Sequence, residues 1–230
     1  YNSKNGYAYS LDDPSTYKVT AYSFKNGTHV MFSHFGTMHS FSSSMMGIFN
    51  VYNLMAAVAA VHITTNKPLD EICEALEGFA GVSGRMETIS SNPLIIVDFA
   101  HTPDGMKEVL QSFNEKDIIC VFGAGGDRDK AKRPLMGSVA ASYSKHIIVT
   151  SDNPRFEDPD MIIEDILKGI KSHKSVEVEI NRKEAIKKAI AMADENSVVL
   201  ILGKGDESTQ TIYDKKFPFS DKEEVLKVLN

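Results

Sequence analysis

The chain has few of the features that mark a secreted, membrane-spanning or nucleic-acid-binding protein. It has two cysteines in 230 residues, Cys73 and Cys120, and both lie in apolar stretches, which favours buried free thiols in a reducing compartment. We identify no signal peptide, and the richest apolar run, 54–61, is too short to cross a bilayer. With a net charge of −6 and no long basic run, neither nucleic acid nor an anionic membrane is expected as a partner. We therefore expect a soluble, cytoplasmic protein.

Motifs that would name a reaction directly are also scarce. The histidines show no metal-ligand spacing, and no nucleophile stands beside a base. The glycine-rich segment 123–126 is not closed by the Gly-Lys-Ser/Thr of a phosphate loop. The 42% of hydrophobic and 24% of charged residues are ordinary for a globular protein. The chain can therefore bury a real core, but its composition names no activity.

The first 80 residues differ in pattern from the rest. Short β-rich pieces at 17–22 and 28–33 are followed by an alanine-rich helix over 50–61, which is apolar nearly all round and is therefore expected to be buried. A second amphipathic helix is predicted over 69–79. A few hairpins and two helices make a poor independent core, so we interpret this part as the tail of another domain.

From Pro93 onward, continuous apolar strands alternate with helices, which predicts a parallel sheet covered on both faces. The fold class is therefore α/β, with a doubly wound, Rossmann-like second domain of mostly parallel strands. A joint within 81–92 separates two domains, at 1–82 and 83–230. The predicted strands are 94–99, 118–122, 146–150, 176–180 and 198–202, and the predicted helices are 103–113, 133–144, 159–172, 182–194 and 220–229.

Thr150 to Arg155 carries the clearest chemical signal, because it follows the apolar run 146–149. Ligands bind past the carboxyl ends of the strands in open α/β sheets. Pro154 stiffens the turn, Arg155 offers a planar fork to a carboxylate, and Asp152 accepts from an ammonium group. The segment favours a zwitterionic amino acid as ligand.

Three more loops follow predicted strands. Segment 123–134 combines glycines with four cationic side chains, which suits an anion, although a plain turn between strand and helix explains the glycines equally well. Segment 203–207 offers Glu207 as a second carboxylate. In segment 98–104, Thr102 and Asp104 suit a helix cap, whereas Asp98 and His101 are candidates for a site. These residues indicate an anionic or zwitterionic ligand on one sheet edge and do not name a reaction.

Taken together, the motifs resemble those of a known family. The matching pieces, in family order, are Phe49-Asn50-Val51-Tyr52-Asn53, Gly84-Arg85-Met86-Glu87, Val97 to Asp104, Gly125 to Pro134, Asp152-Asn153-Pro154-Arg155 and Gly203-Lys204-Gly205 with Glu207. Over about 47–210 the chain resembles the C-terminal portion of the Mur ligases of peptidoglycan synthesis, in particular the MurE-type branch.

This resemblance implies an ATP-dependent amide ligase that phosphorylates the carboxylate of a UDP-N-acetylmuramoyl dipeptide. The amine of meso-diaminopimelate, the amino acid that the Asp-Asn-Pro-Arg motif marks, then attacks the acyl phosphate. The residues implied to hold diaminopimelate are Arg128, Asp152, Asn153, Arg155, Gly203 and Glu207. Those implied to lie near ATP are Asn50, Asn53, Arg85, Asp98 and His101.

The chain also departs from the family pattern. The family's UDP-sugar domain, ATP loop, magnesium ligands and carbamylated lysine are expected upstream of Tyr1, so no catalytic residue or metal ligand is assigned here and this chain is expected to be inactive alone. Asp206 stands where the family has histidine. Two alternatives remain open: a stand-alone amino-acid-binding module and a ligase similar to folylpolyglutamate synthetase.

Overall fold

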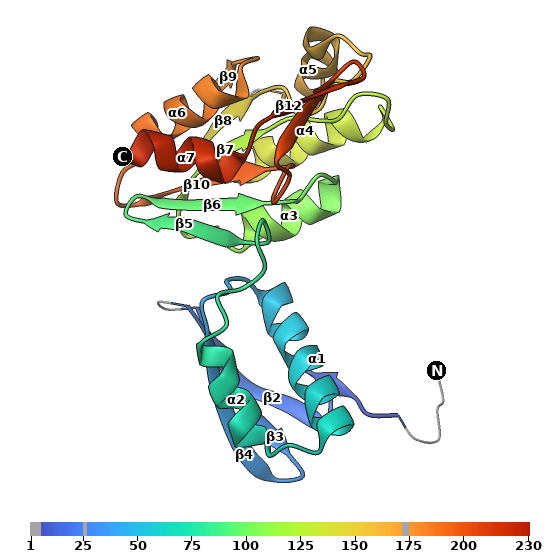
Figure 1. The fold of residues 1–230 in the computed structure, drawn as a ribbon, viewed down its shortest axis with the longest axis vertical. Coiled ribbons are helices and arrows are strands. Elements are labelled where there is room, and N and C mark those ends of the chain that lie inside the picture. Colours follow the sequence, from blue (N-terminus) through green and yellow to red (C-terminus); the bar gives the residue numbers. More distant parts are fainter. Residues whose placement is uncertain (1–5, 25–26, 172–174) are drawn as a thin grey trace. The chain divides into compact units, whose positions relative to one another are not determined.

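The computed structural model describes residues 6–24, 27–171 and 175–230. These residues form two compact units, divided between Gly81 and Val82, and each is described by itself (Figure 1). The first unit is a four-stranded sheet with two helices. Strand β1 pairs parallel with β2, and β2, β3 and β4 pair antiparallel in that order. The elements are β1 (Tyr9–Ser10), β2 (Tyr17–Ser23), β3 (Thr28–His34), β4 (Thr37–Ser43), α1 (Ile48–Thr65) and α2 (Leu69–Glu77).

Helix α1 is longer and less buried than the sequence predicts. Val51, Leu54 and Val58 are buried in the core of the unit. The opposite side of the helix is exposed, with Val61 at 40%. The expectation of burial nearly all round was therefore wrong for this unit, because apolar alanines tolerate water on one face while the larger side chains fill the core.

The same helix also corrects the expectation about apolar runs. Ile48–Thr65 contains no Asp, Glu, Lys or Arg and has a mean hydropathy of 1.4. By length and composition alone it is long enough to cross a membrane, a test that the core helix of a globular unit also passes. The run 54–61 is thus part of a longer uncharged helix.

The second unit is a six-stranded sheet in the order β5-β6-β10-β7-β8-β9. All its pairs are parallel except β5–β6, which confirms the mostly parallel α/β fold. The strands are β5 (Glu87–Ser91), β6 (Leu94–Asp98), β7 (Asp117–Phe122), β8 (His146–Val149), β9 (Val176–Val178) and β10 (Ser197–Leu202). The helices are α3 (Pro103–Gln111), α4 (Lys132–Tyr143), α5 (Pro159–Leu167), α6 (Arg182–Met192) and α7 (Asp221–Leu229).

Helices cover both faces of this sheet. Helices α3, α4 and α5 pack one against the next, and α6 packs against α7 (Figure 1). Val97, Val121 and Ile201 share a core with Ala185 and Ile186 of α6. Successive side chains of a strand point to opposite faces, so the intervening strand residues face the other helix layer. The apolar strands therefore build two cores, one on each face.

Local sequence explains where several of these helices begin. Thr102 caps α3 by accepting from Gly105 N, as predicted, and Pro103 follows at the first helical position. Asn181 caps α6 by accepting from Lys183 N and Glu184 N. The predicted end of α5 at 172 lies outside the described residues. These caps fix the start of each helix next to the carboxyl edge of the sheet.

Three strands of the second unit were missed from the sequence. Strand β5 lies inside the predicted joint 81–92 and adds an antiparallel edge to the sheet. Strands β11 (Thr209–Ile212) and β12 (Lys215–Pro218) form an antiparallel hairpin between β10 and α7. Their polar four-residue segments lack the alternation that marks a half-buried strand.

Candidate amino-acid site

One cavity collects the loops that follow four neighbouring strands. Strand β10 lies between β6 and β7, and the chain leaves β10 towards α7 while β6 and β7 lead to α3 and α4. Such a reversal of connections opens a crevice at the carboxyl edge of a sheet. The cavity there has a volume of about 380 Å³ and is lined by Phe99, His101, Gly123, Ala124, Gly125, Arg128, Asp129, Lys132, Asp152, Asn153, Arg155, Gly203 and Glu207.

All six residues predicted to hold an amino acid line this cavity: Arg128, Asp152, Asn153, Arg155, Gly203 and Glu207. They come from three loops that are far apart in the sequence. The cations Arg128, Lys132 and Arg155 face the same space as the anions Asp129, Asp152 and Glu207. A cavity with side chains of both signs suits a ligand that carries ammonium and carboxylate groups.

Arg155 is held in an uncommon backbone conformation. Its φ of 51° lies in the left-handed region, which costs a residue with a side chain on the order of 1 kcal/mol or more. The hairpin holds it there, since Arg155 N donates to Thr211 O at 3.1 Å and Tyr213 N donates to Arg155 O at 2.8 Å. Arg155 Nη1 donates to Gly126 O at 2.7 Å, which anchors the guanidinium at the cavity wall.

The glycines of segment 123–126 bring two loops together. A Cβ on Gly126 would lie 1.9 Å from Pro154 O, and Gly126 N donates to Asn153 O at 2.9 Å. At this position glycine is required by the close approach of the backbone, as the plain structural interpretation of the segment holds. Gly203, with a φ of 115°, likewise allows Asp152 to approach, because a Cβ there would lie 2.9 Å from Asp152 Oδ2.

Glu207 and Asn153 belong to one partly buried hydrogen-bond network. Asn153 Nδ2 donates to Glu207 Oε2 at 2.8 Å, and Lys204 Nζ donates to the same oxygen at 2.8 Å. Burial raises the pKa of the Glu207 carboxyl, but these two bonds, together with the charges of Lys204 and Arg155, hold the pKa below its ordinary value. Glu207 is therefore a carboxylate at neutral pH, as binding of an ammonium group requires.

Three of the residues predicted to lie near a nucleotide surround the end of β6. The Arg85 guanidinium lies 4.2 Å from the centre of the Phe99 ring, and the His101 ring lies 4.7 Å from it in an edge-on arrangement. Asp98 accepts from Met86 N at 2.8 Å and Ala100 N at 2.7 Å. Burial raises the pKa of Asp98 above its ordinary value despite these bonds.

The other two belong to the first unit. Asn50 is buried at the start of α1, where its Nδ2 donates to Met46 O at 2.7 Å. Asn53 is exposed, and its Nδ2 donates to Asn50 Oδ1 at 3.2 Å. The two asparagines therefore form one hydrogen-bonded pair.

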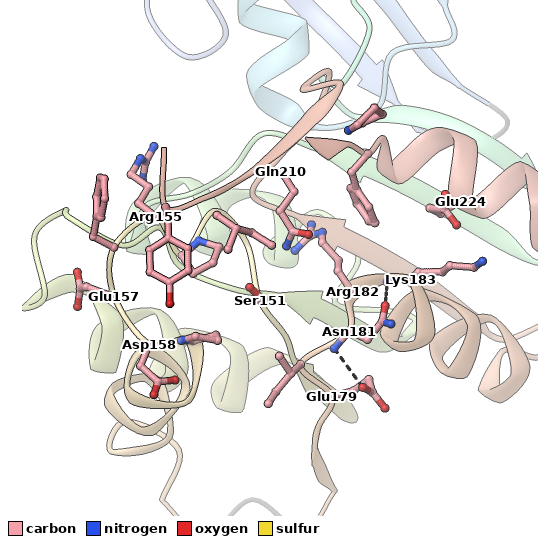
Figure 2. A pocket seen from close by; sticks show the side chains of 18 residues that line it. Ser151, Arg155, Glu157, Asp158, Glu179, Asn181, Arg182, Lys183, Gln210 and Glu224 are labelled. Atoms are coloured by element: carbon pink, nitrogen blue, oxygen red, sulfur yellow. Dashed lines mark hydrogen bonds between the residues drawn. The ribbon is translucent and has the colours of Figure 1, made fainter. Parts of the chain in front are cut away.

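A second, larger cavity of about 930 Å³ is lined by the loop after β8, the starts of α5 and α6, and the β11–β12 hairpin (Figure 2). Among the described residues, Arg155 is the one predicted site residue that lines it. Two of the charged groups there are engaged by the fold, since Glu157 pairs with Arg133 and Arg182 pairs with Asp221. The smaller cavity is therefore the better candidate for the amino-acid site.

Sequence reasoning missed several residues that shape the smaller cavity. Lys204 lies within the Gly203-Lys204-Gly205 motif but was not among the predicted site residues, and Gln210 and Thr211 lie in the hairpin that was not predicted. Gln210 Nε2 donates to Asp152 O at 2.6 Å, and Thr211 N donates to Asn153 Oδ1 at 2.8 Å. A lysine between two glycines directly after an apolar strand was the available signal for Lys204.

Comparison with known proteins bears on the same residues. The family model described as Mur ligase, glutamate ligase domain, matches residues 84–205. The UDP-N-acetylmuramoyl-L-alanyl-D-glutamate--2,6-diaminopimelate ligase of Wolinella succinogenes is 48% identical over 229 residues, which are 100% of this chain and 53% of that protein. The ligase of the same name from Helicobacter pylori is 44% identical and covers 98% of this chain and 52% of that protein.

Solved structures are similar as well. A structure of a ligase of that name superposes with a TM-score of 0.72 at 34% identity, covering 97% of this chain and 47% of that chain. The Mycobacterium tuberculosis folylpolyglutamate synthase superposes with a TM-score of 0.67 at 19% identity, covering 82% of this chain and 45% of that chain, which shows a shared fold. The chain spans about half the length of the relatives it matches.

Proposed function

Because this chain belongs to the Mur ligase family, we propose that the protein is an ATP-dependent ligase that adds meso-diaminopimelate to UDP-N-acetylmuramoyl-L-alanyl-D-glutamate. The observation that carries the proposal is the single cavity lined by all six predicted amino-acid-binding residues. Relatives at 44% and 48% identity bear the name of this ligase. Because such a reaction would consume ATP and a UDP-sugar peptide, we propose that the protein acts in the cytoplasm.

The cavity residues divide by charge. Arg155 and Arg128 would take carboxylates of diaminopimelate, while Asp152 and Glu207 would together take one ammonium group, which leaves the other amine to react. Diaminopimelate has a second carboxylate that lysine lacks, so a site built around an arginine leaves that guanidinium without its ligand carboxylate when lysine binds. Selectivity follows from the cost of the unpaired group.

ATP would supply the activation of the dipeptide carboxyl group. The residues at the end of β6 fit a nucleotide, because the Phe99 ring and the Arg85 guanidinium offer a face on which a base can stack. We assign Asn50, Asn53, Arg85, Asp98 and His101 to the nucleotide side. Among the described residues no three His, Cys, Asp or Glu side chains gather in a way that could hold a metal ion.

The division of the chain into two compact units supports a proposal about its domains. We assign 1–82 to the C-terminal part of the family's central, ATP-binding domain and 83–230 to its amino-acid-binding domain. The boundary between the two compact units, after Gly81, supports this assignment. The matched segment 84–205 falls within the second domain.

Calorimetric titration tests the amino-acid site. The chain is expected to bind meso-diaminopimelate more tightly than L-lysine or L-glutamate. Arg155→Ala is expected to weaken diaminopimelate binding about 10- to 100-fold, since a charge-assisted pair is lost. Lys187→Ala, which removes an exposed positive charge from α6, serves as the matched control and should bind as the wild type does.

Two outcomes would contradict this assignment. One is equal affinity for lysine and diaminopimelate, and the other is preference for glutamate, which would favour a ligase similar to folylpolyglutamate synthase. The complete reaction, which this chain alone is not expected to carry out, is tested with the full-length protein by mass spectrometry of the UDP-N-acetylmuramoyl tripeptide formed with ADP and phosphate.

A further inference from the structure

Lys204 is a fully buried cation directly beside the proposed site. It is 0% exposed, and each of its three ammonium hydrogens has an acceptor. Lys204 Nζ donates to Glu207 Oε2 at 2.8 Å, to Thr209 O at 2.8 Å and to Asn153 Oδ1 at 3.2 Å. Lysine is almost never buried completely unless it is paired, and here a specific set of partners stabilises the buried charge.

The side chain of Lys204 does not line the cavity, although two of its three partners do. Its ammonium group therefore reaches a ligand only through Asn153 and Glu207. The hydrogen bonds from Lys204 restrict the orientation of the Asn153 and Glu207 side chains. Glu207 Oε2 accepts from Lys204 and Asn153, while Asn153 Oδ1 accepts from Lys204 and from Thr211 N.

We propose that Lys204 is a positioning residue that orients Glu207 and Asn153, so that one oxygen of Glu207, Oε1, is left to bind the ligand's ammonium group. The inference rests on the proposed amino-acid site and deepens it. Because Oε2 already accepts hydrogen bonds from Lys204 and Asn153, Glu207 presents a single acceptor, Oε1, to the ligand in a fixed direction. A carboxylate free to rotate would present either oxygen and accept ammonium groups in several poses.

The charge of Glu207 is part of the same arrangement. Burial raises the pKa of this carboxyl, and Lys204 and Asn153 lower it through hydrogen bonds, followed by the charges of Lys204 and Arg155. The buried charge of Arg182 also interacts electrostatically with Glu207 and Asp152. If the Lys204 ammonium group is removed, its lowering effect on the pKa of Glu207 is lost while the raising effect of burial remains. The pKa of Glu207 therefore rises. As the pH falls, Glu207 of such a variant becomes protonated, and loses its affinity for an ammonium group, at a higher pH than Glu207 of the wild type does.

A purely structural role for Lys204 predicts a different pattern. Loss of the buried charge would then lower stability and affinity without depending on Glu207. A double-mutant cycle separates the two roles, because residues that act through each other are not additive. The variants are Lys204→Met, Glu207→Gln and the two combined, each with its thermal unfolding midpoint measured beside its affinity for meso-diaminopimelate.

Positioning predicts that Lys204→Met weakens binding about 10- to 100-fold at pH 7, the range expected when a charged hydrogen bond is lost. In the Glu207→Gln background the same change should weaken binding by less than about threefold. Carbon-13 NMR titration should show the pKa of Glu207 below its ordinary value in the wild type and higher in Lys204→Met. Equal losses of affinity in the two backgrounds would overturn the inference.

The NMR titration of the wild type needs no variant, so the inference remains testable should Lys204→Met not fold. A Glu207 pKa at or above the ordinary value would overturn it. Failure of the wild type to bind diaminopimelate would instead contradict the proposed function. In that case the NMR comparison with Lys204→Met still decides whether Lys204 sets the charge of Glu207.

Discussion

At the scale of single residues, the second unit buries three cations at its carboxyl edge: Arg133, Arg182 and Lys204. Each is paired. Arg182 bonds both carboxylate oxygens of Asp221 and also Leu202 O, the carbonyl just before Gly203. A buried charge left without its partner is strongly destabilising. These pairs tie the cavity loops to the helices behind them.

Glu157 illustrates how such a pair depends on pH. The pKa of its carboxyl is lowered to about 2, mainly by hydrogen bonds from Arg133. Burial raises this pKa, and a hydrogen bond from Lys130 lowers it further. A carboxyl whose pKa is lowered by folding stabilises the fold fully above its ordinary value of 4.5 and loses that contribution as the pH falls towards 2.

We therefore expect Glu157→Gln to lower the free energy of unfolding by about 1–3 kcal/mol at pH 7, because Arg133 keeps Asp165 but loses the negative charge and one of the two acceptor oxygens of Glu157. The difference from wild type should shrink as the pH falls from 4.5 to about 2. Urea unfolding at several pH values measures it. Glu164→Gln, an exposed position on α5, is the control, and a difference independent of pH would refute the assignment.

At the scale of elements, the β11–β12 hairpin connects the sheet to the loop after β8. It pairs with Arg155 through an isolated parallel bridge to Ile212, and its Gln210 and Thr211 bond Asp152 and Asn153. The loop therefore owes its conformation to a hairpin more than 50 residues away in the sequence. Secondary-structure patterns showed the strands and the polar loop, but polar hairpin residues carry no period that reveals their partner.

Removing one of these bonds should affect binding more than folding. Gln210→Ala deletes the donor to Asp152 O, so we expect affinity for diaminopimelate to fall about 3- to 10-fold, as for loss of a single neutral hydrogen bond. Lys216→Ala, exposed on the paired strand β12, is the matched control. Calorimetry measures both, and equal affinity of Gln210→Ala and wild type would show that the bond from Gln210 does not hold the loop in its binding conformation.

At the scale of the whole molecule, the chain consists of two units with separate cores. The cavity that collects the proposed amino-acid residues is lined wholly by residues of the second unit. By contrast, the proposed nucleotide residues are divided between the two. Inactivity of this chain alone, expected from its resemblance, stays a prediction that the tripeptide assay tests.

The second unit should therefore fold and bind diaminopimelate by itself. We expect residues 82–230 to show a cooperative thermal transition and the same affinity as the full chain. Asn50→Ala and Asn53→Ala in the full chain should leave this affinity unchanged. Calorimetry with circular dichroism checks both expectations, and weaker binding by residues 82–230 would show that the first unit contributes to the site.

The amino-acid sequence by itself determined the elements whose cause is local. Apolar runs predicted β6, β7, β8 and β10. Thr102 and Pro103 predicted the start of α3. Polar residues after those strands predicted the edge at which the cavity lies. Periodicity and capping act over a few residues, so they can be read along the chain.

Only the tertiary structure decided which of these residues touch. Lys204 meets Asn153 across 51 positions, and Arg182 meets Asp221 across 39. Such contacts depend on the order of strands in the sheet and on the hairpin that returns to the loop after β8. Burial of a charge is favourable only where its partners converge, and that convergence is a property of the packed fold.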